Sequence, residues 1–173
     1  VGSQVSRAMA AFDQIQVDHQ WTRVSLPSGF SHPVIVAGPL TMNGDEPCVV
    51  RVRNVSASGF DIRLQEYDYL DGSHAAEMVS YLVMERGSFE LAEGTMVEAG
   101  RVETSACNSS FDAVRFSSGF SRAPVVQATV NSFNDASAVT TRVNKVRPSG
   151  FAVQMQEQQG SDQAHGQESI GYV

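Results

Sequence analysis

The chain has 173 residues, 42% of them hydrophobic, and a formal net charge of −7 with a single lysine. This acidic balance, without a basic stripe, disfavours nucleic acid and anionic membrane surfaces as partners. No run of about 18 apolar residues occurs, so we predict no membrane insertion.

Alternation of apolar and polar residues predicts short strands along most of the chain. In the first half the expected strands are 15–17, 21–26, 34–36, 49–55, 60–65 and 79–83. Only residues 5–12 hint at a helix or an irregular lead-in. Residues 84–110 join the halves, and part of this segment is expected to form the first strand of the second half. There the remaining strands are expected at 111–116, 125–130, 139–146, 151–156 and 170–172.

The second half repeats the first with an offset of 90 or 91 residues. Gly29-Phe30-Ser31 returns as Gly119-Phe120-Ser121, and Ser58-Gly59-Phe60 returns as Ser149-Gly150-Phe151. About a third of some sixty aligned positions are identical, which indicates a duplication. We therefore predict an all-β fold of two tandem antiparallel β-sandwich units with about six short strands each, spanning residues 1–86 and 87–173.

A spaced pattern of core and turn residues occurs in both halves. The first half carries Val24, Leu26, Phe30, Pro33-Val34, Arg51, Arg53-Asn54-Val55 and Gly59-Phe60 with Ile62; the second carries Val114, Phe116, Phe120, Pro124-Val125, Arg142, Val146 and Gly150-Phe151 with Val153. This pattern resembles the H-type lectin domain. The resemblance implies a six-stranded antiparallel sandwich, homo-oligomers and binding of galactose-type sugars.

The end of each half carries a more specific pattern: Gln-Glu, an acidic loop, Asp-x-x-His-x-x-Glu and a short strand ending in Tyr. It resembles a bacterial branch of these domains that occurs in tandem in large secreted proteins. The resemblance implies an extracellular location, a glycan or polysaccharide as partner, and a longer multi-repeat assembly. Family lectins place a sugar-contacting aromatic beside the histidine. The first half offers Tyr67 and Tyr69 there, whereas the second has Gln158 and Gln159.

The polar residues of this segment form the candidate site. Glu66 has the parity of Ile62 and Leu64, and Glu77 has that of Val79, so both point inward. If their strands pair as a hairpin, the two glutamates face each other at the mouth of the sandwich, below the loop. The candidate ligand-binding residues are Arg51, Glu66, Tyr67, Tyr69, Asp71, His74, Glu77, Arg142, Glu157, Asp162, His165 and Glu168.

Three interpretations of this cluster remain open. In a structural one, His74 neutralises the two carboxylates and Asp71 caps a turn. In the second, the cluster forms the floor of a glycan site and a tyrosine offers an apolar face. In the third, Ca²⁺ is the cofactor. Its ligands would be Glu66, Asp71 and Glu77, and in the second half Glu157, Asp162 and Glu168.

Two carboxylates also serve glycoside hydrolysis. Units of about 85 residues rarely build the long cleft that such enzymes need, so we predict that the chain is not an enzyme. Arg51 and Arg142 have outward parity and are expected on the surface, paired with a residue such as Asp61; the resemblance implies sugar contacts instead. Cys48 and Cys107 could form a disulfide across the units or remain two thiols.

Together these observations predict a non-catalytic carbohydrate-binding module of an extracellular protein, in which repetition strengthens weak binding. The alternative is a structural or assembly module of an adhesin, spike or fibre, whose strand edges pair with neighbouring chains. We expect further sequence or a partner beyond Val173, because the repeat stops there within its last strand.

Overall fold

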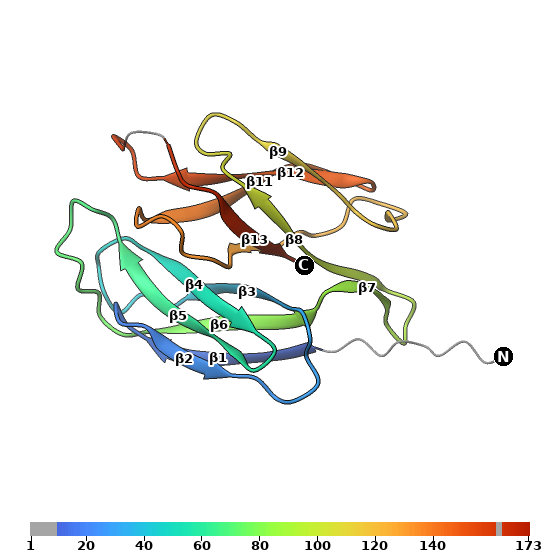
Figure 1. Cartoon of the computed structure of the whole chain (residues 1–173), viewed down its shortest axis with the longest axis horizontal. Coiled ribbons are helices and arrows are strands. Elements are labelled where there is room, and N and C mark those ends of the chain that lie inside the picture. The colour runs from blue at the N-terminus through green and yellow to red at the C-terminus, as the bar shows by residue number, and fades with distance from the viewer. Residues whose placement is uncertain (1–9, 162–163) are drawn as a thin grey trace.

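Antiparallel strands supply the regular structure of the chain (Figure 1). The structure is a computed structural model and describes residues 10–161 and 164–173. The strands of the first half are β1 (Ala10–Val17), β2 (Thr22–Ser25), β3 (Pro33–Leu40), β4 (Cys48–Ser56), β5 (Gly59–Glu66) and β6 (Glu77–Glu85). Those of the second are β7 (Gly87–Glu90), β8 (Met96–Thr104), β9 (Asp112–Arg115), β10 (Ala128–Val130), β11 (Val139–Arg147), β12 (Gly150–Glu157) and β13 (Glu168–Tyr172). The predicted all-β antiparallel fold is confirmed.

The start of the described chain differs from the helical expectation for residues 5–12. Residues 10–12 open β1, whose partners along β6 run from Ala10–Met84 to Val17–Glu77, while residues 5–9 lie outside the described part. Eight cross-strand pairs bind this segment to β6, and such pairing overrides a weak local preference for helix. Within the described residues, no helix is long and apolar enough to cross a bilayer.

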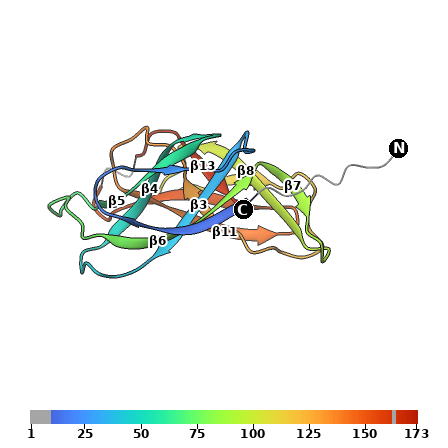
Figure 2. The same cartoon turned by 90° about the horizontal axis from the view of Figure 1, so that it is seen from below.

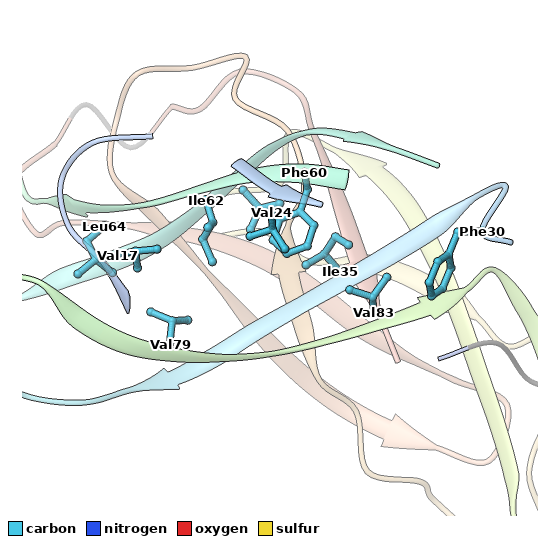
Figure 3. Packing of buried hydrophobic residues seen from close by; sticks show 10 residues of the cluster. Val17, Val24, Phe30, Ile35, Phe60, Ile62, Leu64, Val79 and Val83 are labelled. Atoms are coloured by element: carbon cyan, nitrogen blue, oxygen red, sulfur yellow. The ribbon is translucent and has the colours of Figure 1, made fainter. Parts of the chain in front are cut away.

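Two three-stranded sheets form the first half, with strand orders β1-β6-β3 and β2-β5-β4. Their inward residues meet between the sheets, as Figure 3 shows for nine labelled side chains. This first core consists of Val17, Val24, Phe30, Ile35, Val52, Phe60, Ile62, Leu64, Val79 and Val83. Phe60, Ile62 and Leu64 of β5 belong to it, which is the period-two pattern of a strand with one buried face.

The expected hairpin between β5 and β6 is wrong. β5 pairs with β2 and β4, whereas β6 pairs with β1 and β3, so the connection at residues 67–76 crosses from one sheet to the other. A loop of this length is long enough to change sheets, and the inward residues of both strands then meet in the core rather than along a ladder.

The second half has the sheets β11-β12-β9 and β10-β13-β8-β7. β8 pairs with β13 as β1 pairs with β6, so the joining segment does supply the first strand of this half, and β7 adds a further edge strand. The second core consists of Cys107, Val114, Val130, Val139, Phe151, Val153, Met155, Ile170 and Tyr172. The division at residues 86 and 87 stays a prediction: one core lies on either side of it, but a third buried cluster, made of Val34, Met84, Phe89 and Ala99, spans it.

The two halves pack directly on each other, one above the other in Figure 1 and seen from below in Figure 2. The edge strand β3 is covered by side chains of β10. Asn131 accepts from Ile35 N at 3.0 Å and donates to Ile35 O at 2.9 Å, and Thr129 Oγ1 accepts from Ala37 N at 3.0 Å. The second half thus satisfies backbone groups that an open sheet edge would leave unpaired.

Two equivalent glycines fix the turn into the central strand of each half. Gly59 has φ +153° and Gly150 has φ +156°. A Cβ at either position would lie 2.1 Å from a backbone oxygen, of Val24 and of Val114 respectively. Only glycine fits this close approach, which explains why the Ser-Gly-Phe sequence occurs in both repeats.

Candidate functional site

A histidine bridges two glutamates at the end of the first core. We call Glu66, His74 and Glu77 the first cluster. His74 Nδ1 lies 3.1 Å from Glu66 Oε1, and His74 Nε2 lies 3.5 Å from Glu77 Oε1. The three side chains are at most 2% exposed. Because Glu66 ends β5 and Glu77 begins β6, the imidazole links the two sheets of the sandwich.

The second half rebuilds this arrangement with Glu157, His165 and Glu168, the second cluster. His165 Nδ1 lies 2.8 Å from Glu157 Oε1, and His165 Nε2 lies 3.4 Å from Glu168 Oε1. These side chains are at most 1% exposed. The inward parity predicted for the four glutamates is therefore right, although they face each other across the sandwich and not along a strand pair.

The second glutamate of each cluster is also bound by the loop that follows β3 or β10. Glu77 accepts from Thr41 Oγ1 at 2.5 Å, from Asn43 N at 2.6 Å and from Gly44 N at 2.8 Å. The equivalent donors to Glu168 are Ser132 Oγ, Asn134 N and Asp135 N. Charge-assisted bonds of this kind favour the ionised carboxylate and hold the loop against the cluster.

Asn43 and Asn134 also bind these loops to the chain, each through the carbonyl of the residue that precedes the second glutamate of its cluster. The Asn43 amide donates to Ala76 O at 3.0 Å, and the Asn134 amide donates to Gln167 O at 2.7 Å. Both asparagines recur at one offset, two residues after a hydroxyl residue in both halves. This recurrence alone predicts turn formers and only secondarily ligand contacts, so neither asparagine is among the candidate ligand-binding residues.

The hydrogen bonds of the second cluster shift its pKa values in opposite directions. Burial acts against a charged imidazole, but the bonds with Glu168 and Glu157 outweigh it and raise the pKa of His165. Burial likewise opposes ionisation of Glu168, but His165, Ser132 and two backbone N–H groups together lower its pKa. Backbone donors from Ser137 and Gly166 lower the pKa of nearby Asp135 to about 2. The cluster thus favours an ion pair of imidazolium and carboxylate.

The two candidate arginines occupy different environments. Arg51 is fully buried, so the expected surface position is wrong. It points outward from its own sheet, but the second half covers it. Its guanidinium lies 3.3 Å from Glu168 Oε1 and donates to Ser137 O at 2.5 Å and to Asp135 O at 3.2 Å. Arg142 is exposed and bonds to Gln156. Asp61, the expected partner, pairs with Arg23 and Arg53.

The aromatic residues of the connection between β5 and β6 lie on the surface above the first cluster. Tyr67 and Tyr69 stack with ring centroids 6.2 Å apart, and Tyr69 is 67% exposed. Asp71 accepts from Ser73 N at 2.9 Å, which is the turn-capping role expected for it. Tyr67 also borders a cavity of about 240 Å³ between the halves, with Leu40, Val50 and Val139 in its wall.

The carboxylates near this loop differ from the predicted calcium set. Ligand atoms of Glu46, Glu66 and Asp71 lie within 4.8 Å of one another, so Glu46 takes the place expected for Glu77. The Glu77 carboxylate instead accepts hydrogen bonds from Thr41, Asn43 and Gly44. In the second half, Asp162 lies outside the described residues. Oxygen ligands of this kind suit Ca²⁺, and calcium binding stays a prediction, which a fall in melting temperature on adding a chelator would support.

Cys48 and Cys107 are not joined in a disulfide. Cys48 Sγ lies 3.4 Å from His74 Nε2, while Cys107 is buried in the second core. Burial, together with the carboxylates of Glu77 and Glu66, raises the pKa of Cys48 to about 11. Cys48 therefore contributes a neutral thiol to the edge of the first cluster.

Comparison with known proteins gives one informative similarity. The chain is 32% identical over 177 residues to Halomucin of Haloquadratum walsbyi, a match that covers 94% of this chain and 2% of Halomucin. The chain thus spans a small fraction of its relative's length. No protein-family model and no solved structure matches the chain. The similarity is compatible with an extracellular module and carries no evidence of a ligand.

Proposed function

We propose that the chain is a non-catalytic structural module of an extracellular protein, in which each acid–imidazole cluster holds its sandwich closed. The observation that carries this proposal is burial. In both clusters every glutamate and histidine side chain is at most 2% exposed and contacts atoms of its own chain. Buried ionisable groups that are paired and hydrogen-bonded in this way fix one arrangement of the elements around them.

The same burial argues against hydrolysis. A glycosidase needs one carboxylate at the sugar and a second beside a water or the anomeric carbon. Here Glu66 and Glu77 share one imidazole in the interior, and Glu77 accepts three further bonds from its loop. We therefore expect no release of reducing ends from polysaccharides incubated with the protein.

An extracellular location is supported by the similarity to Halomucin. The coverage of the match also supports the assignment as a module, because 94% of this chain matches 2% of a much longer protein. The internal repeat fits the same picture, since tandem sandwiches make good spacers.

The test replaces each histidine separately. His74→Ala and His165→Ala each leave two buried carboxylates without their shared partner, so we expect each to lower the free energy of unfolding by about 3–5 kcal/mol in urea titrations. His32→Ala is the matched control, because the His32 side chain is 79% exposed. If the two variants unfold like the control, the clusters do not hold the fold together and the proposal is wrong.

Carbohydrate binding remains a second candidate, favoured by the exposed tyrosine stack. Stacked aromatic faces suit the apolar side of a sugar ring, and the exposed Asp68 and Asp71 beside them can accept from hydroxyl groups. A glycan array with the purified chain should then show selective binding. Tyr69→Ala should abolish it without changing the melting temperature, and Tyr69→Phe should retain it. If the array shows no binding, this candidate is excluded.

A further inference from the structure

One part of the contact between the two halves, beside the contact of β3 with β10 described above, is asymmetric. On the first half it uses the outer side of β2-β5-β4, which we call the first face and define as Trp21, Arg51, Arg53, Arg63 and Gln65. On the second half it uses residues 132–138, the second loop. A face of one half therefore holds a loop of the other.

The side chain of Phe133 anchors the second loop on the first face. Its ring centroid lies 4.6 Å from Arg51 Cζ, 5.1 Å from Arg63 Cζ and 5.4 Å from the Trp21 ring, which it meets edge-on. Around this anchor, side chains of the face bind carbonyls of the loop: Gln65 Nε2 donates to Ala136 O at 2.6 Å and Arg51 to Ser137 O. These contacts combine cation–π attraction with backbone recognition.

The repeat places a similar face on the second half. Phe111, Arg142 and Gln156 align with Trp21, Arg51 and Gln65, and we call Phe111, Arg142, Asn144, Gln154 and Gln156 the second face. Arg142 is exposed there and Phe111 is 42% exposed, whereas Gln154 is buried, so the open part of the second face lies around Arg142 and Phe111. A symmetric pairing of face and loop would have buried Arg142 as it buries Arg51, so this part of the contact is heterologous, whereas β3 meets its equivalent β10 and β4 meets its equivalent β11.

The repeat also places a matching loop on the first half. Residues 41–47, the first loop, align with the second loop, and Met42 takes the position of Phe133. Met42 is 81% exposed, and the loop also presents the exposed acidic residues Asp45 and Glu46. An apolar anchor beside acidic groups complements a face with Phe111 and Arg142.

We propose that the second face of one chain binds the first loop of a second copy, so that chains join head to tail. Met42 of one copy packs on Phe111 of the next, Arg142 donates to the carbonyls of Gly44 and Glu46, and Gln156 donates to that of Asp45. The proposal rests on the structural function proposed above and gives it an assembly mode. Because each chain offers one face and one loop, the contact generates open filaments or rings.

Association between copies should be weaker than the internal contact. Thr129 and Asn131, which bind the edge of β3, align with Gly38 and Leu40, so those bonds have no equivalent between copies. Arg63 of the first face is replaced by Gln154, which removes a cation–π partner.

The test measures mass against concentration by sedimentation. We expect the chain to be monomeric when dilute and to grow beyond a dimer as its concentration approaches about 1 mM, the range of weak specific contacts. Arg142→Glu should abolish binding by the second face, and Met42→Glu should abolish binding by the first loop, so each variant alone should stay monomeric. Mixed together they retain one intact face and one intact loop, and the mixture should form a 1:1 dimer that grows no further. Arg122→Glu, an equal charge change at an exposed arginine outside both surfaces, should associate like the parent chain.

Three results would overturn the proposal: a parent chain that stays monomeric to about 1 mM, a mixture that stays monomeric while the parent chain associates, or a loss of association in Arg122→Glu as large as in Arg142→Glu. Positions 42 and 142 are exposed, so Met42→Glu and Arg142→Glu should melt at the temperature of the parent chain. This measurement shows that each variant is folded. None of these results touches the structural proposal, which depends on the unfolding of the histidine variants.

Discussion

Arg51 and Glu168 form an ion pair that joins the two halves of the molecule, with 3.3 Å between Nη2 and Oε1 and both side chains fully buried. Arg51 comes from β4 of the first half, and Glu168 belongs to the second cluster. The second cluster is therefore completed by the first half, whereas the equivalent Arg142 reaches no cluster of this chain. Removing one member of such a pair leaves the other charged and buried.

Arg51→Met should lower the free energy of unfolding by about 3–5 kcal/mol, because Glu168 loses its arginine partner at a position where both side chains are fully buried. Arg142→Met is the matched control at the equivalent exposed position, and we expect it to cost less than about 1 kcal/mol. Urea titrations of both variants measure the difference. Equal effects at the two positions would contradict the asymmetry of the pair.

Replacing both partners tests whether the pair acts as a unit. The double variant Arg51→Met, Glu168→Gln carries no unpaired charge, so it should unfold at a higher urea concentration than the sum of its single variants implies. An additive double variant would mean that the two side chains do not interact.

The second cluster should give the fold a stability maximum in mildly acidic solution. The pKa of His165 is raised in the folded state, so its contribution is complete below the ordinary value of 6.5 and is lost as the pH rises through the folded pKa. The pKa of Glu168 is lowered, so its contribution is present above the ordinary value of 4.5 and is lost as the pH falls through the folded pKa. Melting temperatures between pH 3 and pH 9 should therefore peak at about pH 5–6.5.

His165→Gln serves as the control for the alkaline side of that profile. The amide can retain a hydrogen bond but carries no proton to lose, so the decline above pH 6.5 should flatten. A parent chain whose melting temperature rises steadily from pH 6 to pH 8 would contradict this assignment.

The local pattern predicted the fold and the inward direction of the cluster residues. Glu66 follows the alternation that buries Phe60, Ile62 and Leu64, and the same period places Glu77 with Val79. Side-chain parity depends on neighbouring residues alone and is therefore visible in a sequence. Strand pairing is not visible in a sequence in this way. β5 and β6 are neighbours in sequence, yet each takes its partners from a different sheet.

The different environments of Arg51 and Arg142 could not be predicted. Both positions carry the same residue, the same outward parity and an alternating strand around them. What separates them is the docking of the second half on the first face, a long-range contact that no periodicity encodes. The same contact explains why the candidate ligand residue Arg51 has no exposed surface.

Trp21 should report on that contact, because it is the only tryptophan of the chain and its ring meets Phe133 edge-on. Phe133→Ala removes the anchor and admits water, so the fluorescence of Trp21 should shift to longer wavelength and the free energy of unfolding should fall by about 2 kcal/mol. Met42→Ala truncates the equivalent exposed side chain and should change neither. An unaltered spectrum in Phe133→Ala would mean that the halves do not pack as described.

Cys48 should be slow to alkylate in the folded chain. Burial and the nearby carboxylates of Glu77 and Glu66 raise its pKa to about 11, so little thiolate forms at pH 8, where an ordinary cysteine reacts readily. We expect iodoacetamide to react about 100-fold more slowly with the folded chain than with the chain in urea.

In urea two thiols should be modified, because Cys48 and Cys107 are not joined. Cys48→Val, which installs the residue of the equivalent position Val139, should leave one reactive thiol and a similar melting temperature. Rapid labelling of Cys48 in the folded chain would contradict its burial beside the glutamates, and a chain in urea without reactive thiols would show that the cysteines pair after all.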